Sequence, residues 1–177
     1  MSAPTPTLGR QPTLASSCAR AATAAEARFR ISYPDASRRD SRVIALDRRT
    51  ADLARQLADG QPWRGGHFLV LDTVVPAGDD TRLRTTGGDE VLLSEELADA
   101  DVVVMLAGPT DGTGASSEAA AVIGDACAAR FIMSAGLVVP GGGPTDEVVA
   151  ALRPNAMVLV ILQDSDDVAE VLSALRV

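Results

Sequence analysis

All sixteen basic residues of this 177-residue chain are arginine, so lysine is absent. A Walker-A phosphate loop needs a lysine that reaches the phosphates, and a Schiff-base enzyme needs a lysine amine. The sequence therefore excludes both classes. It also disfavours a phosphoaspartate receiver, in which a lysine accompanies the aspartate.

Aromatic residues and long apolar runs are also scarce. Only 3% of the residues are aromatic, although 46% are apolar. The core must therefore consist of Val, Leu, Ile and Ala, which suits a parallel sheet covered by alanine-rich helices. No apolar run approaches the roughly 20 residues that a membrane span requires. We expect a soluble protein with no membrane partner.

Histidine and cysteine are too few for several kinds of site. His67 is the only histidine, and Cys18 and Cys127 are far apart. A Cys/His zinc site would need more ligands, so we expect no metal site of this kind. A Ser-His-Asp triad would have to use His67, which we expect instead to begin a strand. The cysteine usage fits a reducing, cytoplasmic location.

The charge is divided unevenly between the two parts of the chain. Residues 1–39 hold six arginines against Glu26 and Asp35, a net charge of +4, whereas the remainder carries −12. We interpret residues 1–38 as a disordered or weakly structured tail and residues 39–177 as one Rossmann-like α/β domain. The acidic domain argues against nucleic acid as a partner, because such binding depends largely on neutralising phosphates.

From residue 42 onward, apolar strands alternate with amphipathic helices. This pattern predicts a doubly wound, mainly parallel sheet of about five strands, with flanking helices and a small hairpin excursion over 81–93. The expected helix caps are hydroxyl side chains: Thr50, Ser94, Ser116 or Ser117, and Ser165. Val168, Val171, Leu172 and Leu175 form the core stripe of the last helix.

The carboxyl ends of the parallel strands should form a ligand crevice. The candidate residues are two strand-end acids and two glycine-rich loops with a helix start: Asp47, Asp72, Gly108, Thr110, Asp111, Gly112, Thr113, Gly114, Ser116, Gly141 and Gly142. Backbone amides at Gly112 to Gly114 would hold a phosphate. Asp47 or Asp72 would accept a hydrogen bond from a ribose hydroxyl. Asp111 would either help to hold a divalent cation or form an Asx turn. The alternative is a structural role, because strand-to-helix turns often need glycine and a strand-end aspartate often caps the following helix.

The stretch from Val102 to Val139 resembles the nucleotide-binding domain of the FtsZ/tubulin family. It contains an apolar strand, the step Ala107-Gly108, the loop Asp111-Gly-Thr-Gly114, an alanine-rich helix and a further strand over 136–139. The resemblance covers residues 100–139 and implies binding of GTP or another nucleotide with Mg²⁺. Only the central Gly-Thr-Gly of the family loop is present, and the family's long core helix and activation domain do not follow. The resemblance therefore implies binding without efficient GTP hydrolysis or polymerisation.

Three functions remain open at this stage. The first is a module that binds a nucleotide or small phosphorylated ligand. The second is a Rossmann enzyme or enzyme subunit that uses NAD(P), although no Gly-x-Gly-x-x-Gly follows the first strand. The third is a non-catalytic interaction subunit with a protein partner or a second copy of itself. The sequence does not decide whether the chain catalyses a reaction.

Overall fold

The structure is a computed structural model that describes residues 39–73, 81–109 and 115–177. The predicted tail, residues 1–38, lies outside the described residues. In the part of the chain that is described, no helix is long and apolar enough to cross a membrane.

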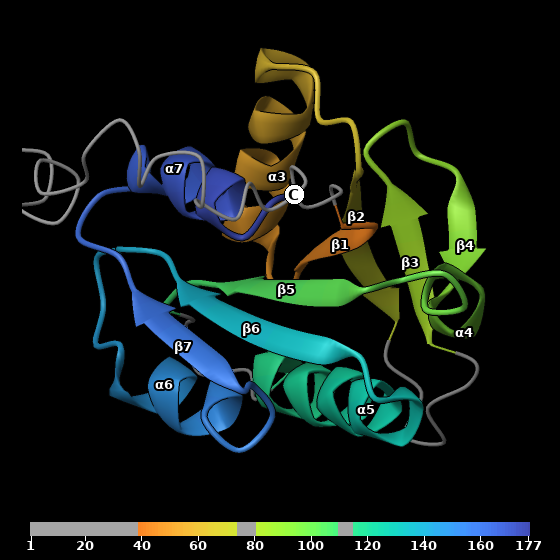
Figure 1. Ribbon diagram of the computed structural model, residues 1–177. Helices are drawn as coiled ribbons and strands as arrows, with labels where there is room; N and C mark the ends of the chain where they lie inside the picture. The colour runs from red at the N-terminus through yellow and green to blue at the C-terminus, as the bar shows by residue number, and fades with distance from the viewer. Residues whose placement is uncertain (1–38, 74–80, 110–114) are drawn as a thin grey trace, which may run out of the picture. The chain divides into compact units, whose positions relative to one another are not determined.

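The domain is an α/β fold built on one mainly parallel sheet (Figure 1). The strand order is β4-β3-β2-β1-β5-β6-β7. The strands are β1 (Ser41–Ala45), β2 (Gly66–Thr73), β3 (Arg82–Thr85), β4 (Glu90–Leu92), β5 (Val102–Ala107), β6 (Met133–Val138) and β7 (Val158–Ile161). β3 and β4 run antiparallel to their neighbours, and the other five strands are mutually parallel.

The strand count of the sequence prediction was too low. The sheet has seven strands rather than about five, because the hairpin of β3 and β4 continues it instead of standing apart. Hydrogen bonding decides this point, since β2 has a free edge that β3 pairs with from Leu69 to Thr73. Hydrophobic patterning shows that a hairpin forms but not where it attaches.

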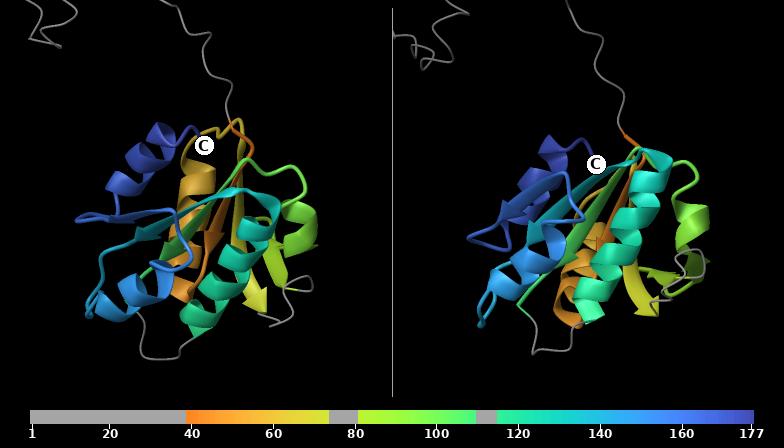
Figure 2. Two further views of the ribbon diagram at one scale, coloured as in Figure 1. Left: turned by 60° about the horizontal axis from the view of Figure 1, so that its bottom comes forward. Right: turned by 90° about the horizontal axis from the view of Figure 1, so that it is seen from below.

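Helices cover both faces of the sheet (Figures 1 and 2). The helices are α3 (Arg48–Gly60), α4 (Leu93–Glu96), α5 (Ala115–Arg130), α6 (Asp146–Leu152) and α7 (Asp167–Ala174). The α3 and α7 helices pack on one face, and α4, α5 and α6 pack on the other. The central strand β5 is therefore buried along its whole length, as its unbroken apolar run predicts.

The last helix carries the expected core stripe in part. Val168 and Leu172 are fully buried against the sheet, whereas Val171 and Leu175 are only partly buried.

The helix starts differ from the predicted hydroxyl caps. Asp47, not Thr50, caps α3, and the two residues form a capping box. The α4 helix begins at Leu93, α5 at Ala115 and α7 at Asp167, so the predicted serine caps at 94, 116, 117 and 165 are not the cap positions. A carboxylate competes well with a hydroxyl for the free amides of a first turn, which favours Asp47 over Thr50.

Gly124 lets α5 approach the turn that precedes β7. A Cβ atom at this position would lie 2.6 Å from Cβ and 3.0 Å from Cα of Asn155. Asn155 is held in place, because its side-chain amide donates to the Ala151 carbonyl and its own carbonyl accepts from Ser134 Oγ. The glycine is therefore required by packing, at a cost in helix propensity.

Gly124→Ala should destabilise the protein by up to about 2 kcal/mol. Helix propensity alone would give a gain of about 1 kcal/mol, but overpacking against Asn155 typically costs about 1–3 kcal/mol. Urea unfolding followed by circular dichroism measures the difference. Gly60→Ala is the matched control, because nothing lies within 4 Å of its would-be Cβ. A stabilised Gly124→Ala protein would contradict this account of the packing.

Candidate functional site

Three loops meet at the carboxyl ends of β1, β5 and β6. The Gly108 amide, after β5, donates a hydrogen bond of 2.8 Å to Asp47 Oδ2, after β1. The other carboxylate oxygen, Asp47 Oδ1, accepts from the Thr50 amide at 2.9 Å. On the other side of β5, the Val139 amide donates to the Ala107 carbonyl at 2.8 Å. These bonds hold the two predicted residues Asp47 and Gly108 together.

The second glycine loop packs closely against the first. A Cβ atom at Gly141 would lie 2.7 Å from Arg49 Nη1 and 2.8 Å from Pro109 Cδ. Gly141 therefore has a steric role, because it admits both the proline ring and the guanidinium. At Gly142, by contrast, a Cβ would meet nothing within 4 Å. The backbone of this loop is thus partly open beside Arg49.

Two arginines occupy an electrostatically unfavourable position here. Arg48 and Arg49 are the first two residues of α3, and no acidic residue lies in its first turn. The positive end of a helix dipole disfavours cations by roughly 0.3–1 kcal/mol each. Among the described residues, Arg49 forms no ion pair. The Asp47 carboxylate at the N-cap offsets part of the positive charge at this helix end.

Arg49 also borders a cavity of about 240 Å³ between α3 and the start of α7. The other lining residues are mainly polar: Asp52, Leu53, Gln56, Val139 and Ser165. The volume is below the roughly 300–1,000 Å³ of sites that enclose a drug-sized ligand. The cavity is therefore too small to enclose a whole dinucleotide, and its lining holds the Asp52 carboxylate as well as Arg49.

The remaining predicted residues of this edge divide into two groups. Thr110, Asp111, Gly112, Thr113 and Gly114 lie outside the described residues. Ser116 is the second residue of α5. Within the ranges that the structure describes, no three His, Cys, Asp or Glu side chains are grouped so that they could hold a metal ion.

Asp72 does not join the loops around Asp47. Both of its carboxylate oxygens bind Arg84 of β3, with Oδ1 3.0 Å from Nε and Oδ2 3.2 Å from Nη2. Hydrogen bonding from Arg84 holds the pKa of Asp72 below its usual value. The predicted contact of Asp72 with a ribose hydroxyl would have to compete with this bidentate pair.

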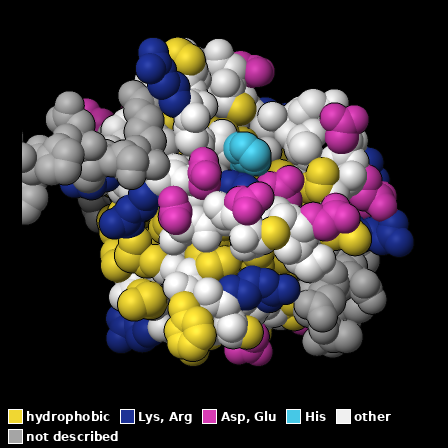
Figure 3. Space-filling view, turned by 45° about the vertical axis from the view of Figure 1, so that its right-hand side comes forward, with side chains coloured by type: hydrophobic (Ala, Val, Ile, Leu, Met, Phe, Trp, Pro, Cys, Tyr) yellow, Lys and Arg dark blue, Asp and Glu magenta, His cyan; other side chains and the backbone are white. Residues whose placement is uncertain are grey.

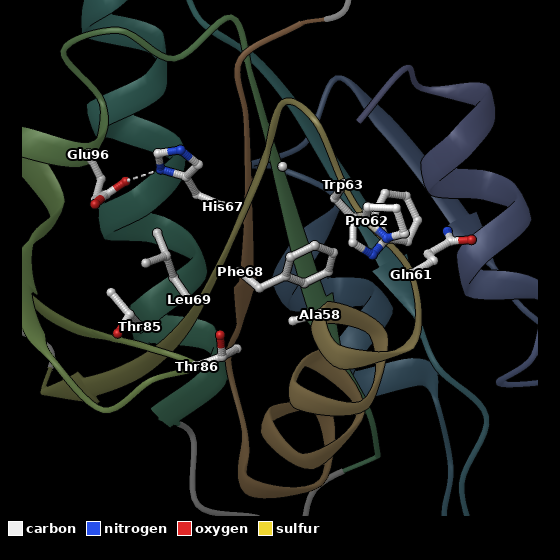
Figure 4. A pocket seen from close by; sticks show the side chains of 11 residues that line it. Ala58, Gln61, Pro62, Trp63, His67, Phe68, Leu69, Thr85, Thr86 and Glu96 are labelled. Atoms are coloured by element: carbon white, nitrogen blue, oxygen red, sulfur yellow. Dashed lines mark hydrogen bonds and ion pairs between the residues drawn. The ribbon is translucent and has the colours of Figure 1, made fainter.

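His67 lies near the start of β2, at the opposite end of the sheet. It is exposed, and Figure 3 shows it in cyan among acidic side chains. Its Nδ1 lies 3.3 Å from Glu96 Oε2, an interaction drawn in Figure 4. The cavity of about 310 Å³ beside this pair is lined by no serine or cysteine. The residues that line it therefore do not supply the nucleophile of the triad considered from the sequence.

Glu96 also faces a buried arginine from β1. Arg42 Nε lies 2.8 Å from Glu96 Oε2, but its N–H does not point at that oxygen, so the contact is an ion pair without a hydrogen bond. Arg42 is only 5% exposed, and its Nη1 is buried without a hydrogen-bond partner. Glu96 thus neutralises a buried charge, which gives this carboxylate a structural role.

Sequence reasoning missed Arg49 as a site residue. The available signal was the pair Arg48-Arg49 directly after a strand-end aspartate, where helix starts usually carry acids. Neither a scan against models of protein families nor a comparison with curated protein sequences gives a match for this chain.

Asp47→Ala should lower the free energy of unfolding by about 2–4 kcal/mol. Loss of a helix N-cap costs about 1 kcal/mol, and the buried Gly108 amide loses its acceptor at a further cost of about 1–3 kcal/mol. Chemical denaturation measures this change. Asp52→Ala is the control, because that exposed side chain forms its one ion pair within the described ranges with Arg55 of the same helix. Equal stability of the two variants would mean that the Asp47–Gly108 bond contributes nothing.

Cys127 should be unreactive in the native protein. Burial raises the pKa of its thiol to about 11, and only the thiolate reacts. In a Cys18→Ser protein at pH 8, alkylation should be about 100-fold slower than in urea. Stability should also fall as the pH rises from about 9 toward 11, because the unfolded thiol loses its proton first. Rapid native labelling would contradict the burial of Cys127.

Proposed function

We propose that this protein binds a small phosphorylated ligand, or the phosphate part of a nucleotide, at the carboxyl edge of its sheet. One observation carries the proposal. Arg49 is an exposed guanidinium with no ion-pair partner among the described residues, and it lies against the Gly141 loop at the positive end of α3. Guanidinium groups recognise phosphate through several parallel hydrogen bonds.

The topology supports the same location. On our interpretation the sheet is doubly wound, since α3 follows β1 onto one face and α5 follows β5 onto the other. The two strands are neighbours, so the chain leaves them in opposite directions and a crevice opens between their carboxyl ends. Asp47 and Gly108 lie at this point. The sequence of the loop 110–114 suits further amide donors to a phosphate.

The proposal concerns binding rather than a reaction. Asp47, the acid nearest to Arg49 in the chain, already accepts two backbone hydrogen bonds. The resemblance to the FtsZ/tubulin family makes GTP the first nucleotide to test. NAD tests the alternative of a Rossmann enzyme.

Arg49→Gln should weaken binding about tenfold or more, because one charge-assisted contact contributes roughly 1.5–3 kcal/mol. Calorimetric titrations with GTP, ATP and NAD, each with and without Mg²⁺, measure the affinity of the wild type and the variant. Inorganic phosphate should compete with the ligand that binds.

Arg48→Gln is the matched control, because it removes the same charge from the neighbouring position. It should change the affinity by less than about threefold, as expected for a charge that is largely screened. If none of the three nucleotides binds to folded wild-type protein, the nucleotide proposal fails. The interaction-subunit alternative would then replace it.

A further inference from the structure

One edge of the sheet is formed by an apolar strand, β7. β7 pairs with β6 and forms the margin of the sheet (Figure 1). Four large apolar side chains are exposed in the described residues, and three of them lie in or next to β7: Met157 at 77%, Val158 at 41% and Ile161 at 48%. The apolar surface is thus concentrated on one strand.

The opposite margin of the sheet is protected. β4 has only three residues, and its exposed Glu90 forms ion pairs with Arg82 and Arg84 of β3. Short, charged edge strands prevent pairing with other chains. The segment 157–162, Met-Val-Leu-Val-Ile-Leu, contains no charge and no proline. In the part of the chain that the structure describes, no strand pairs with the outward backbone amides and carbonyls of β7, which suit a further strand.

The charges that flank β7 are of opposite sign. Arg153 precedes the strand, is exposed and forms no ion pair within the described part of the chain. Asp164, Asp166 and Asp167 follow the strand and are exposed. An antiparallel copy of the same strand would bring each arginine to the acidic end of the other. A parallel copy would place like charges together, which is unfavourable.

We propose that β7 pairs antiparallel with β7 of a second copy of this chain, so that the two sheets join across a two-fold axis. A two-fold axis normal to the sheet pairs residues of the same face. With Leu159 opposite Leu159 of the second copy, Met157 lies opposite Ile161, and the end of each strand that Arg153 precedes meets the acidic end of the other strand. The contact between Met157 and Ile161 then occurs twice, once on each side of the two-fold axis.

Sedimentation equilibrium of the full chain tests the proposal. The wild type should form a dimer at micromolar concentration. Ile161→Lys should raise the dimer dissociation constant about tenfold or more, since it places two charges in the apolar contact. Phe131→Lys is the matched control, because Phe131 is 98% exposed and lies outside β7. This variant should retain the wild-type dissociation constant, and circular dichroism should show both variants folded.

Exchange of the flanking charges tests the direction of pairing. Arg153→Glu and Asp166→Arg should each weaken the dimer, and the double variant should recover most of the wild-type affinity. A wild type that remains monomeric throughout the micromolar range would overturn the proposal. A dimer that Phe131→Lys dissociates while Ile161→Lys does not would also overturn it. Additive rather than compensating effects of the charge exchange would exclude the antiparallel arrangement.

Discussion

The Asp47 carboxylate connects the parts of the structure on which the proposed function depends. One of its oxygens accepts from the Thr50 amide and starts α3, and the other accepts from the Gly108 amide and fixes the exit of β5. A carboxylate that accepts hydrogen bonds from two backbone amides is a rigid link between loops. The direction of α3, the place of Arg49 and the path of the chain after β5 are therefore set by one side chain.

Burial of the central strands moves the polar chemistry to the ends of the sheet. β1 and β5 are buried along their whole length, so they present no side chains to solvent between their ends. At the carboxyl end, two glycine loops and the start of α3 bring Arg49, Pro109 and Gly141 into contact. At the amino end, Glu96 forms an ion pair with the buried Arg42 and contacts His67. At the carboxyl end, the Arg49 guanidinium therefore has no ion-pair partner among the described residues and is available for a ligand.

The two edge strands of the sheet also differ, because one edge is charged and ion-paired and the other is apolar. The hairpin margin is closed by ion pairs of Arg82, Arg84, Glu90 and Asp72. The β7 margin carries apolar side chains and, among the described residues, backbone groups that no other strand pairs with and that a second strand would satisfy. Pairing through β7 would place Asp164 and Asp166 near the contact, on either side of Ser165, which borders the cavity beside Arg49. The proposed dimer contact and the proposed ligand site therefore share this segment of the chain.

The sequence by itself determined which segments are buried. The apolar run Val102–Ala107 predicted a strand covered on both faces, because periodicity reflects burial. The spacing of four residues predicted the inner face of α7, and two of them, Val168 and Leu172, are fully buried, whereas Val171 and Leu175 are only partly buried. Only the tertiary structure decided the attachment of the hairpin to β2, the Asp47–Gly108 bond and the contact between Arg49 and Gly141. These contacts join residues up to 92 positions apart in the chain. They depend on strand order and on the exact approach of loops, which local patterns of polarity do not record.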